Sequence, residues 1–223
     1  MLEILMPRLS WEGSRLEEIY TMFQASPELG FLYKASLKDH IRENDSRGTL
    51  WAAYRDRQLV GVATVGSRRA YSHLLRHGEI HVPKAFRRQR VGTSLYFVQL
   101  LQALLEGRRE LEDTIIPALS PWMPEFLSAL QYTLYGLLPQ RTGGFKDIML
   151  WGKKSFEVDG YLDRLPDDLN RIELYDTAKT RETFDKNLLN YLGHDPSLAE
   201  RIKVLRLWVF EVASVDVEGS DAS

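Results

Sequence analysis

The sequence VPKAFRRQRVGTSLY, residues 82–96, joins a short apolar strand to a helix that begins at Gly92-Thr93. The loop between them is rich in arginine. A helix N-terminus presents unpaired backbone N–H groups and the positive end of the helix dipole. Arginine adds a planar fork of donors that fits phosphate oxygens. This stretch therefore predicts an anion-binding loop at the start of a helix.

The rest of the chain alternates between strand-like and helix-like patterns. Apolar residues at helical spacing predict helices, and runs of β-branched and aromatic residues predict strands. The expected strands cover residues 2–6, 49–54, 59–65, 78–82, 114–119, 134–138 and 145–151, and the expected helices cover residues 14–24, 37–42, 91–105 and 124–132. This order mixes a meander with one helical crossover, which predicts an α+β protein.

The loop motif Arg87-Arg88-Gln89-Arg90-Val91-Gly92 resembles the Arg/Gln-x-x-Gly-x-Gly/Ala loop of the GNAT superfamily of N-acetyltransferases. Arg90 stands where the first glycine is usual. The resemblance implies that backbone amides of the loop bind the pyrophosphate of acetyl-CoA, and that the preceding strand offers its edge to the pantetheine arm. The cofactor-binding residues that it implies are Ile80, His81, Val82, Arg87, Arg88, Gln89, Arg90, Val91, Gly92 and Thr93.

The resemblance extends over residues 1–154. It implies a mixed, mostly antiparallel central sheet with helices on both faces. Residues 132–137 resemble the Tyr-x-x-x-Gly-Phe turn that follows the fourth main helix of the family, with Leu137 in place of phenylalanine, and residues 143–150 resemble its final strand. We therefore expect a GNAT-like acyltransferase domain over residues 1–154.

Residues 155–223 form a separate extension in this interpretation. From Phe156 onward there are eight basic and fifteen acidic residues, whereas the preceding part has 21 basic and 16 acidic ones. A basic front suits an anionic cofactor, and an acidic tail weakens a nucleic-acid role for the tail. We expect the extension to be mainly helical and frayed at its end, with two helices around Leu188, Leu189, Leu192 and around Ile202, Leu205, Trp208.

Acetyl transfer to an amine needs an acid for the departing thiolate and a base for the ammonium proton. The resemblance implies Tyr132 as the general acid. Glu79 and His81 are two residues apart, so they share one face of the strand before the loop. Either side chain can accept a proton, and Glu79 is the predicted base.

Other chemistries have little support. The chain has no cysteine, which removes thiolate nucleophiles and cysteine-based zinc sites. Its five histidines stand in no recognised metal-binding motif, so no metal is expected. No apolar run approaches membrane-spanning length, and the first residues lack the pattern of a signal peptide. A cytoplasmic protein that does not enter a membrane is expected.

The sequence therefore predicts an N-acyltransferase that moves acetyl from acetyl-CoA directly to a primary amine of a small molecule or peptide. A second hypothesis is a GNAT-fold protein that acts on charged tRNA or a modified base, through a basic patch of Arg68, Arg69, Arg76, Lys84 and Arg87–Arg90. This alternative is not favoured. A third is a catalytically silent GNAT-like binding module. A homodimer remains open.

Overall fold

The structure is a computed structural model that describes residues 1–7, 14–25, 37–65, 74–117, 120–139, 147–154, 161, 163–176 and 207–211. Its strands are β1 (Leu2–Leu5), β2 (Leu50–Arg55), β3 (Gln58–Val65), β4 (Leu74–His81), β5 (Glu110–Ile115), β6 (Thr133–Leu138), β7 (Ile148–Lys154), β8 (Leu169–Asp176) and β9 (Leu207–Glu211). Its helices are α2 (Ser14–Gln24), α4 (Leu37–Ser46), α5 (Val91–Leu105) and α6 (Met123–Ala129), with a short 3-10 turn, η1 (Lys84–Phe86).

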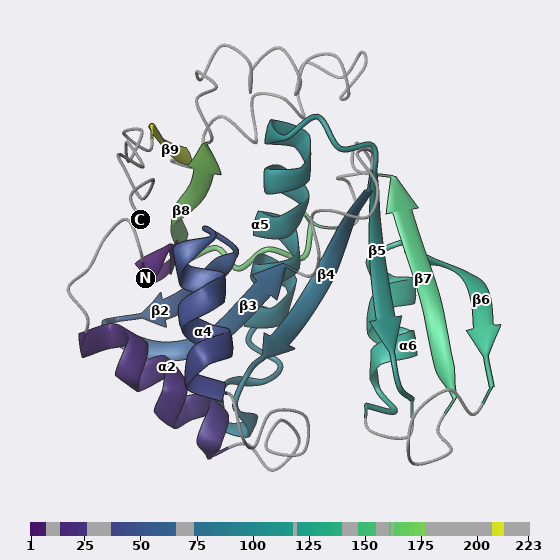
Figure 1. The fold of residues 1–223 in the computed structure, drawn as a ribbon, viewed down its shortest axis with the longest axis horizontal. Helices are drawn as coiled ribbons and strands as arrows, with labels where there is room; N and C mark the ends of the chain where they lie inside the picture. Colours follow the sequence, from purple (N-terminus) through teal and green to yellow (C-terminus); the bar gives the residue numbers. More distant parts are fainter. Residues whose placement is uncertain are drawn as a thin grey trace, which may run out of the picture.

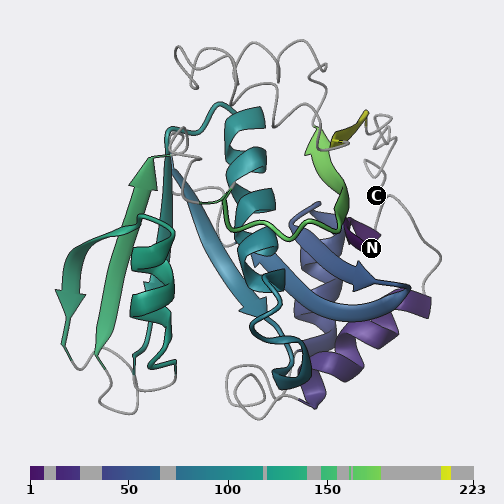
Figure 2. The ribbon, with the colours of Figure 1, turned by 180° about the vertical axis from the view of Figure 1, so that it is seen from behind.

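All these strands belong to one sheet, in the order β6-β7-β5-β4-β3-β2-β1-β8-β9. Most neighbours are antiparallel. Parallel pairs occur between β4 and β5, between β1 and β8, and between β8 and β9. Helices α2 and α4 cover one face of the sheet, and α5 and α6 cover the other (Figures 1 and 2).

Each face of the sheet has its own apolar core. Ile19 and Phe23 of α2 and Ile41 of α4 pack on one face. On the other face α5 contributes side chains that are fully buried, among them Leu95 and Leu101. Burying a leucine stabilises a fold by about 1.5–3 kcal/mol, so α5 is a major source of stability.

Helix α5 is buried on nearly all sides, which is unusual for a helix that lies on a sheet. The reason is that the chain returns over it. Tyr161 and Leu165 are buried against α5, and Figure 2 shows the segment that leads to β8 crossing the outer side of this helix. The apolar pattern of α5 therefore reflects two covers, the sheet beneath and the returning chain above.

The predicted α+β class with helices on both faces of a mostly antiparallel sheet is confirmed. The bounds of α2 and α5 match the prediction, and α4 runs to Ser46 rather than residue 42. Strand β4 begins at Leu74 rather than residue 78, and β5 begins at Glu110 rather than residue 114. Charged residues interrupt the apolar pattern at both starts, which hides the strand.

The prediction of a mainly helical extension is wrong for its described residues. Leu169–Asp176 and Leu207–Glu211 are strands, so the segment around Trp208 that was expected as a helix is β9. Its sequence LWVFE is rich in residues that favour strands, and a spacing of three residues alone does not exclude one. The helix expected around Leu188–Leu192 lies outside the described residues. The domain boundary near residue 155 stays a prediction.

Candidate active site

Strands β4 and β5 are paired only where they begin. Three parallel pairs join Leu74–Arg76 to Glu110–Glu112. Beyond them β4 continues beside β3 to His81, whereas β5 continues beside β7 to Ile115. The two strands therefore diverge along their second halves, as Figure 1 shows.

The diverging half of β4 has distinct groups on its edge and on its two faces. The Glu79 N–H donates to Thr64 Oγ1 of β3 at 3.0 Å. Because successive peptide groups on a strand point to opposite edges, those of Ile80 point toward β5, and no described strand pairs with them there. The side chains of Ile80 and Val82 pack against the core on the α5 face.

The loop after β4 has a conformation that positions backbone groups at the start of α5. It passes through η1, and both Arg88 (φ 65°) and Arg90 (φ 62°) are left-handed. Arg90 is the residue before the helix, and no side chain caps the helix there. A left-handed residue other than glycine costs about 1–2 kcal/mol, which explains why glycine is usual at the Arg90 position of the family motif.

Side chains far apart in the sequence hold this loop in place. Arg87 Nε donates to the Val82 carbonyl at 3.0 Å. Arg90 Nη1 donates to the Leu165 carbonyl at 2.9 Å. Gln89 Oε1 accepts from Arg55 Nη1 at 2.7 Å. Three of the predicted cofactor residues, Arg87, Gln89 and Arg90, thus anchor the loop between β4 and α5 to its surroundings.

Gly92 and Thr93 form the first turn of α5, where helical N–H groups have no intrahelical acceptor. A Cβ at Gly92 would meet only Phe126 and Val82, at 3.9 and 4.0 Å, so the protein's own packing does not require glycine. A cavity of about 450 Å³ lies beside this turn. Its lining residues are Arg90, Thr93, Phe126, Ala129, Leu130, Gln131, Asp163 and Arg164.

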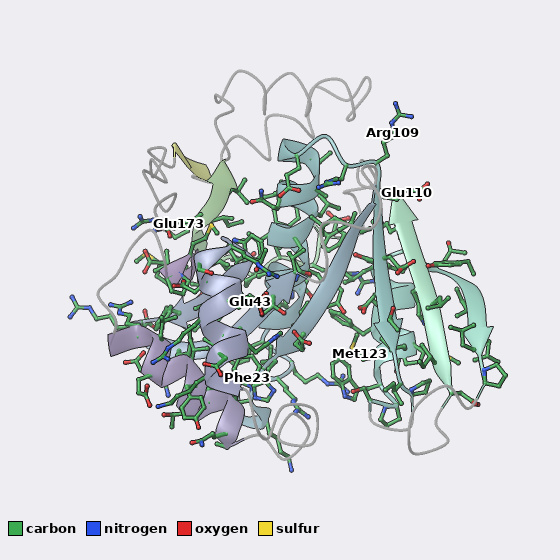
Figure 3. The ribbon with its side chains drawn as sticks, viewed as in Figure 1. Phe23, Glu43, Arg109, Glu110, Met123 and Glu173 are labelled. Atoms are coloured by element: carbon green, nitrogen blue, oxygen red, sulfur yellow. The ribbon has the colours of Figure 1, made fainter. Side chains whose placement is uncertain are left out.

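Glu79 and His81 lie on the same face of the sheet, as their spacing predicts. The Glu79 carboxylate lies 3.3 Å from His40 Nε2 of α4 and accepts from Thr64 Oγ1 at 2.5 Å. The buried His81 ring lies 6.0 Å from the ring of Phe23 of α2, and Figure 3 labels Phe23 on this face. Sequence analysis missed His40, whose only signal is its place on an amphipathic helix.

Tyr132 is buried at the end of α6, between α5 and the returning chain. Its hydroxyl lies 2.8 Å from the Tyr161 hydroxyl, and burial raises the pKa of the Tyr132 phenol well above its usual value. Its ring meets that of Tyr96 edge-on. The phenol is therefore neutral at physiological pH.

The strand predicted over residues 134–138 is confirmed: β6 covers Thr133–Leu138, and Gly136 lies inside it and pairs with Leu150 of β7. The chain enters β6 from α6 through Gln131, which is left-handed with φ 65°. A left-handed glutamine carries no sequence signal of the kind that glycine gives.

Within the described ranges, no group of His, Cys, Asp or Glu side chains is arranged to hold a metal ion. No helix among the described residues is long and apolar enough to span a membrane. Of the basic residues expected to form a nucleic-acid patch, Arg68 and Arg69 lie outside the described residues, as does the side chain of Arg76.

Solved structures of other proteins share this architecture. A protein from Desulfovibrio desulfuricans assigned to the GNAT acetyltransferase family superposes with a TM-score of 0.56 at 13% identity, covering 70% of this chain and 98% of its own. The chain has the GNAT fold. The ribosomal-protein-S18-alanine N-acetyltransferase of Escherichia coli gives a TM-score of 0.53 at 15% identity, with 69% and 94% coverage. An aminoglycoside 6'-N-acetyltransferase complexed with coenzyme A gives 0.57 at 14% identity, with 70% and 97% coverage.

No protein-family model matches the sequence, and no curated protein matches it. The GNAT fold is therefore visible in the arrangement of the elements and not in overall sequence similarity. The parts shared with the solved structures span about the share of the chain that residues 1–154 represent.

Proposed function

We propose that the protein is an N-acyltransferase that uses acetyl-CoA and transfers the acetyl group directly to a primary amine. The observation that carries this proposal is the meeting of two features at one end of β4. The diverging half of β4 leaves peptide groups toward β5, and it leads directly into the loop at the start of α5. In acetyl-CoA the thioester arm is joined to the pyrophosphate, so a binding site for it needs these two features next to each other.

In this proposal the cofactor lies along the diverging strand. The N–H groups at the first turn of α5 and the arginines of the loop bind the pyrophosphate. The peptide groups of Ile80 and Val82 on the β5 side bind the pantetheine arm and polarise the thioester carbonyl, and His81 belongs to the same strand segment. Glycine at position 92 fits this role, because the protein's own contacts leave room for a side chain there and a bound phosphate would fill it.

The amine nitrogen then attacks the thioester carbon, and the carbon–sulfur bond breaks to release the thiolate. Glu79 takes the proton that the ammonium group loses. Tyr132 is the proposed acid, because a neutral phenol can protonate a thiolate. An amine acceptor is supported by the E. coli and aminoglycoside enzymes, whose names state that they acetylate an alanine and an aminoglycoside amine. Cytoplasmic location and a homodimer stay predictions.

Calorimetric titration with acetyl-CoA and with CoA tests the cofactor site. We expect saturable binding by the wild-type protein and a loss of about 100-fold or more in Gly92→Glu, because a carboxylate there opposes the pyrophosphate and loses the favourable dipole. Gly92→Ala is the matched control and should fold and bind CoA with a smaller loss. Absence of binding by the wild type at millimolar ligand contradicts the proposal.

The acid is tested separately. Tyr132→Phe should lower turnover about 100-fold or more while leaving the affinity for acetyl-CoA unchanged. The variant also leaves the buried Tyr161 hydroxyl without this partner, so its unfolding is measured in parallel. Unchanged turnover removes Tyr132 from the mechanism and leaves the remainder of the proposal standing.

A further inference from the structure

A cluster of polar side chains surrounds Glu79 on the face of the sheet that α2 and α4 cover. His40 reaches it from α4 and Thr64 from β3. The side chains of His40 and Glu79 are 27% and 21% exposed. Both are therefore partly withdrawn from solvent and still accessible to a small group. The two residues lie 39 positions apart in the sequence, His40 on α4 and Glu79 in the second half of β4.

The Glu79 carboxylate is held in a fixed orientation. Thr64 Oγ1 accepts from the Glu79 N–H at 3.0 Å and donates to Glu79 Oε2 at 2.5 Å. His40 Nε2 lies 3.3 Å from the same Oε2. One carboxylate oxygen thus meets both a hydroxyl and an imidazole, and the carboxylate is fixed relative to its own strand.

Asn44 of α4 also contacts the imidazole. Asn44 Nδ2 donates to the His40 carbonyl at 2.9 Å, and a carbonyl only accepts, so the amide nitrogen must face His40. Thr49 Oγ1 lies 2.8 Å from Asn44 Oδ1, which agrees with this orientation. Asn44 Nδ2 lies 3.3 and 3.5 Å from the two ring nitrogens. His40 therefore lies between an amide donor and a carboxylate acceptor.

The surroundings favour a proton on His40. The hydrogen bond to Glu79 raises the pKa of His40 above its ordinary value, desolvation opposes this shift, and the charges of Glu79 and Glu43 add to it. Of these two carboxylates, Glu79 belongs to β4 and Glu43 to α4 itself. Figure 3 labels Glu43 on α4.

A carboxylate alone is a poor final acceptor for an ammonium proton. An ordinary glutamate has a pKa of about 4.3 and an ordinary histidine about 6.5, so a proton is held roughly 100-fold more strongly on the imidazole. A carboxylate that touches the amine and passes the proton to an adjacent imidazole combines contact with a better acceptor.

We propose that His40 positions the Glu79 carboxylate and accepts a proton from it. Glu79 takes the proton from the acceptor ammonium group and passes it to neutral His40, leaving an imidazolium–carboxylate pair. This inference rests on the proposed acetyl transfer. The proton moves from nitrogen to the Glu79 carboxylate and then to His40 Nε2, and it leaves to solvent after turnover. Acetyl transfer therefore requires His40 to be neutral beforehand.

The first test follows His40 itself and needs no acceptor. Its ring carbon and proton resonances, assigned with the His40→Gln variant, are titrated with pH by NMR in the wild type and in Glu79→Gln. We expect the His40 pKa to lie above that of an ordinary histidine and to fall in Glu79→Gln. Equal His40 titration in both proteins overturns the proposal. Glu43→Gln is the matched control, and it should lower the His40 pKa less than Glu79→Gln does.

The second test uses acetyl-CoA with a panel of primary amines that includes an aminoglycoside and a peptide with N-terminal alanine. His40→Gln keeps an amide donor beside Glu79 but cannot store a proton. We expect kcat/KM for the amine to fall about 10- to 100-fold, while KM for acetyl-CoA stays unchanged. In the wild type, kcat/KM plotted against pH should fall on the acidic side as His40 becomes protonated. This acidic limb of the pH profile should disappear in His40→Gln.

The double variant His40→Gln/Glu79→Gln should be no slower than Glu79→Gln, because His40 acts only through that carboxylate. Effects that multiply, or an acidic limb that persists in His40→Gln, contradict the proposal. A wild type that fails to bind acetyl-CoA contradicts instead the proposed function, which keeps the two failures distinguishable.

Discussion

Two of the parallel strand pairs in the sheet, β4–β5 and β1–β8, differ in how far the strands stay together. Strands β4 and β5 pair over three residues and then diverge. Strands β1 and β8 stay together, with a single irregularity in register after Leu2. At the first junction the diverging half of β4 pairs with β3, and no described strand pairs with its other edge. At the second, buried side chains hold the strands together.

The β1–β8 junction, called the closed junction below because its strands stay together, depends on Glu173 of β8. This residue is fully buried and labelled in Figure 3. Its Oε2 accepts from the Met6 N–H at 2.8 Å, and its carbonyl accepts from Trp51 Nε1 at 3.0 Å. Arg171 lies 2.6 Å from its other carboxylate oxygen. Parallel pairing thus occurs here in two forms: strands that diverge, where we propose that the cofactor binds, and strands that buried side chains hold together.

The largest effect is expected at the closed junction. Glu173→Ala leaves the Met6 N–H and the Arg171 guanidinium without their acceptor, so the free energy of unfolding should fall by about 3 kcal/mol. This corresponds to a Tm lower by roughly 6–12 °C. Thermal and chemical unfolding measure it. Glu173→Gln keeps an acceptor for Met6 and should lose less. Equal stability of all three proteins would contradict the role of this contact.

Where β4 diverges from β5, it packs closely on β3 beside Glu79. A Cβ at Gly78 would lie 2.4 Å from Thr64 Oγ1 and 2.7 Å from the Thr64 carbonyl oxygen. Gly78→Ala should therefore destabilise the protein by about 1–3 kcal/mol. It should also lower turnover, because it displaces the hydroxyl that holds Glu79. Gly92→Ala, where the space is open, is the control for stability. A Gly78→Ala protein as stable as wild type would show that β3 can move here.

A smaller effect is expected where the two junctions are linked. Asp168 accepts from Arg55 Nε at 2.9 Å and from Nη2 at 3.0 Å, and Arg55 in turn holds Gln89 of the loop. Asp168→Asn should cost about 0.5–1 kcal/mol of stability, since the pair is partly exposed. We expect acetyl-CoA affinity to fall a few-fold as the loop loses support. Calorimetry and denaturant unfolding separate these two effects.

The smallest effect is expected at Asp56, which is exposed and lies 2.8 Å from the N-terminal ammonium group. The hydrogen bond and the charge of that group lower the Asp56 pKa. Any stability from this pair is present above the unfolded pKa of the carboxyl and is lost as the pH falls through the lowered value. Solvent screens it, so Asp56→Asn should unfold like wild type across this acidic range. A measurable difference would mean that the pair is less exposed than in the structure.

The sequence predicted the central part of the fold because its signals there are local. Helix α5 and the loop before it carry apolar periodicity and clustered arginines within 24 residues, and Glu79 and His81 share a face by strand alternation alone. What failed depends on distant partners. His40 can be recognised as a site residue only once α4 has brought it to Glu79 of β4. Strand β8 forms where it can pair with β1, which lies far away in the sequence, and β9 pairs with β8.

The candidate site shows the same division. Arg87 to Thr93 could be named from a motif, whereas Tyr161, Leu165 and Arg55 reach the site only through tertiary contacts. The turn before β6 shows the same limit. Gln131 is left-handed, and glutamine gives no sequence signal for this conformation of the kind that glycine gives.

The position of β1 has a consequence for the order in which the protein folds. Its neighbour β2 is synthesised soon after it, whereas its other neighbour β8 is made much later, and the Met6–Glu173 contact joins residues 167 positions apart. Contacts this distant close slowly. While the chain is being made, one edge of its first strand stays open and able to pair with other chains. Complete folding of the sheet therefore waits until β8 pairs with β1.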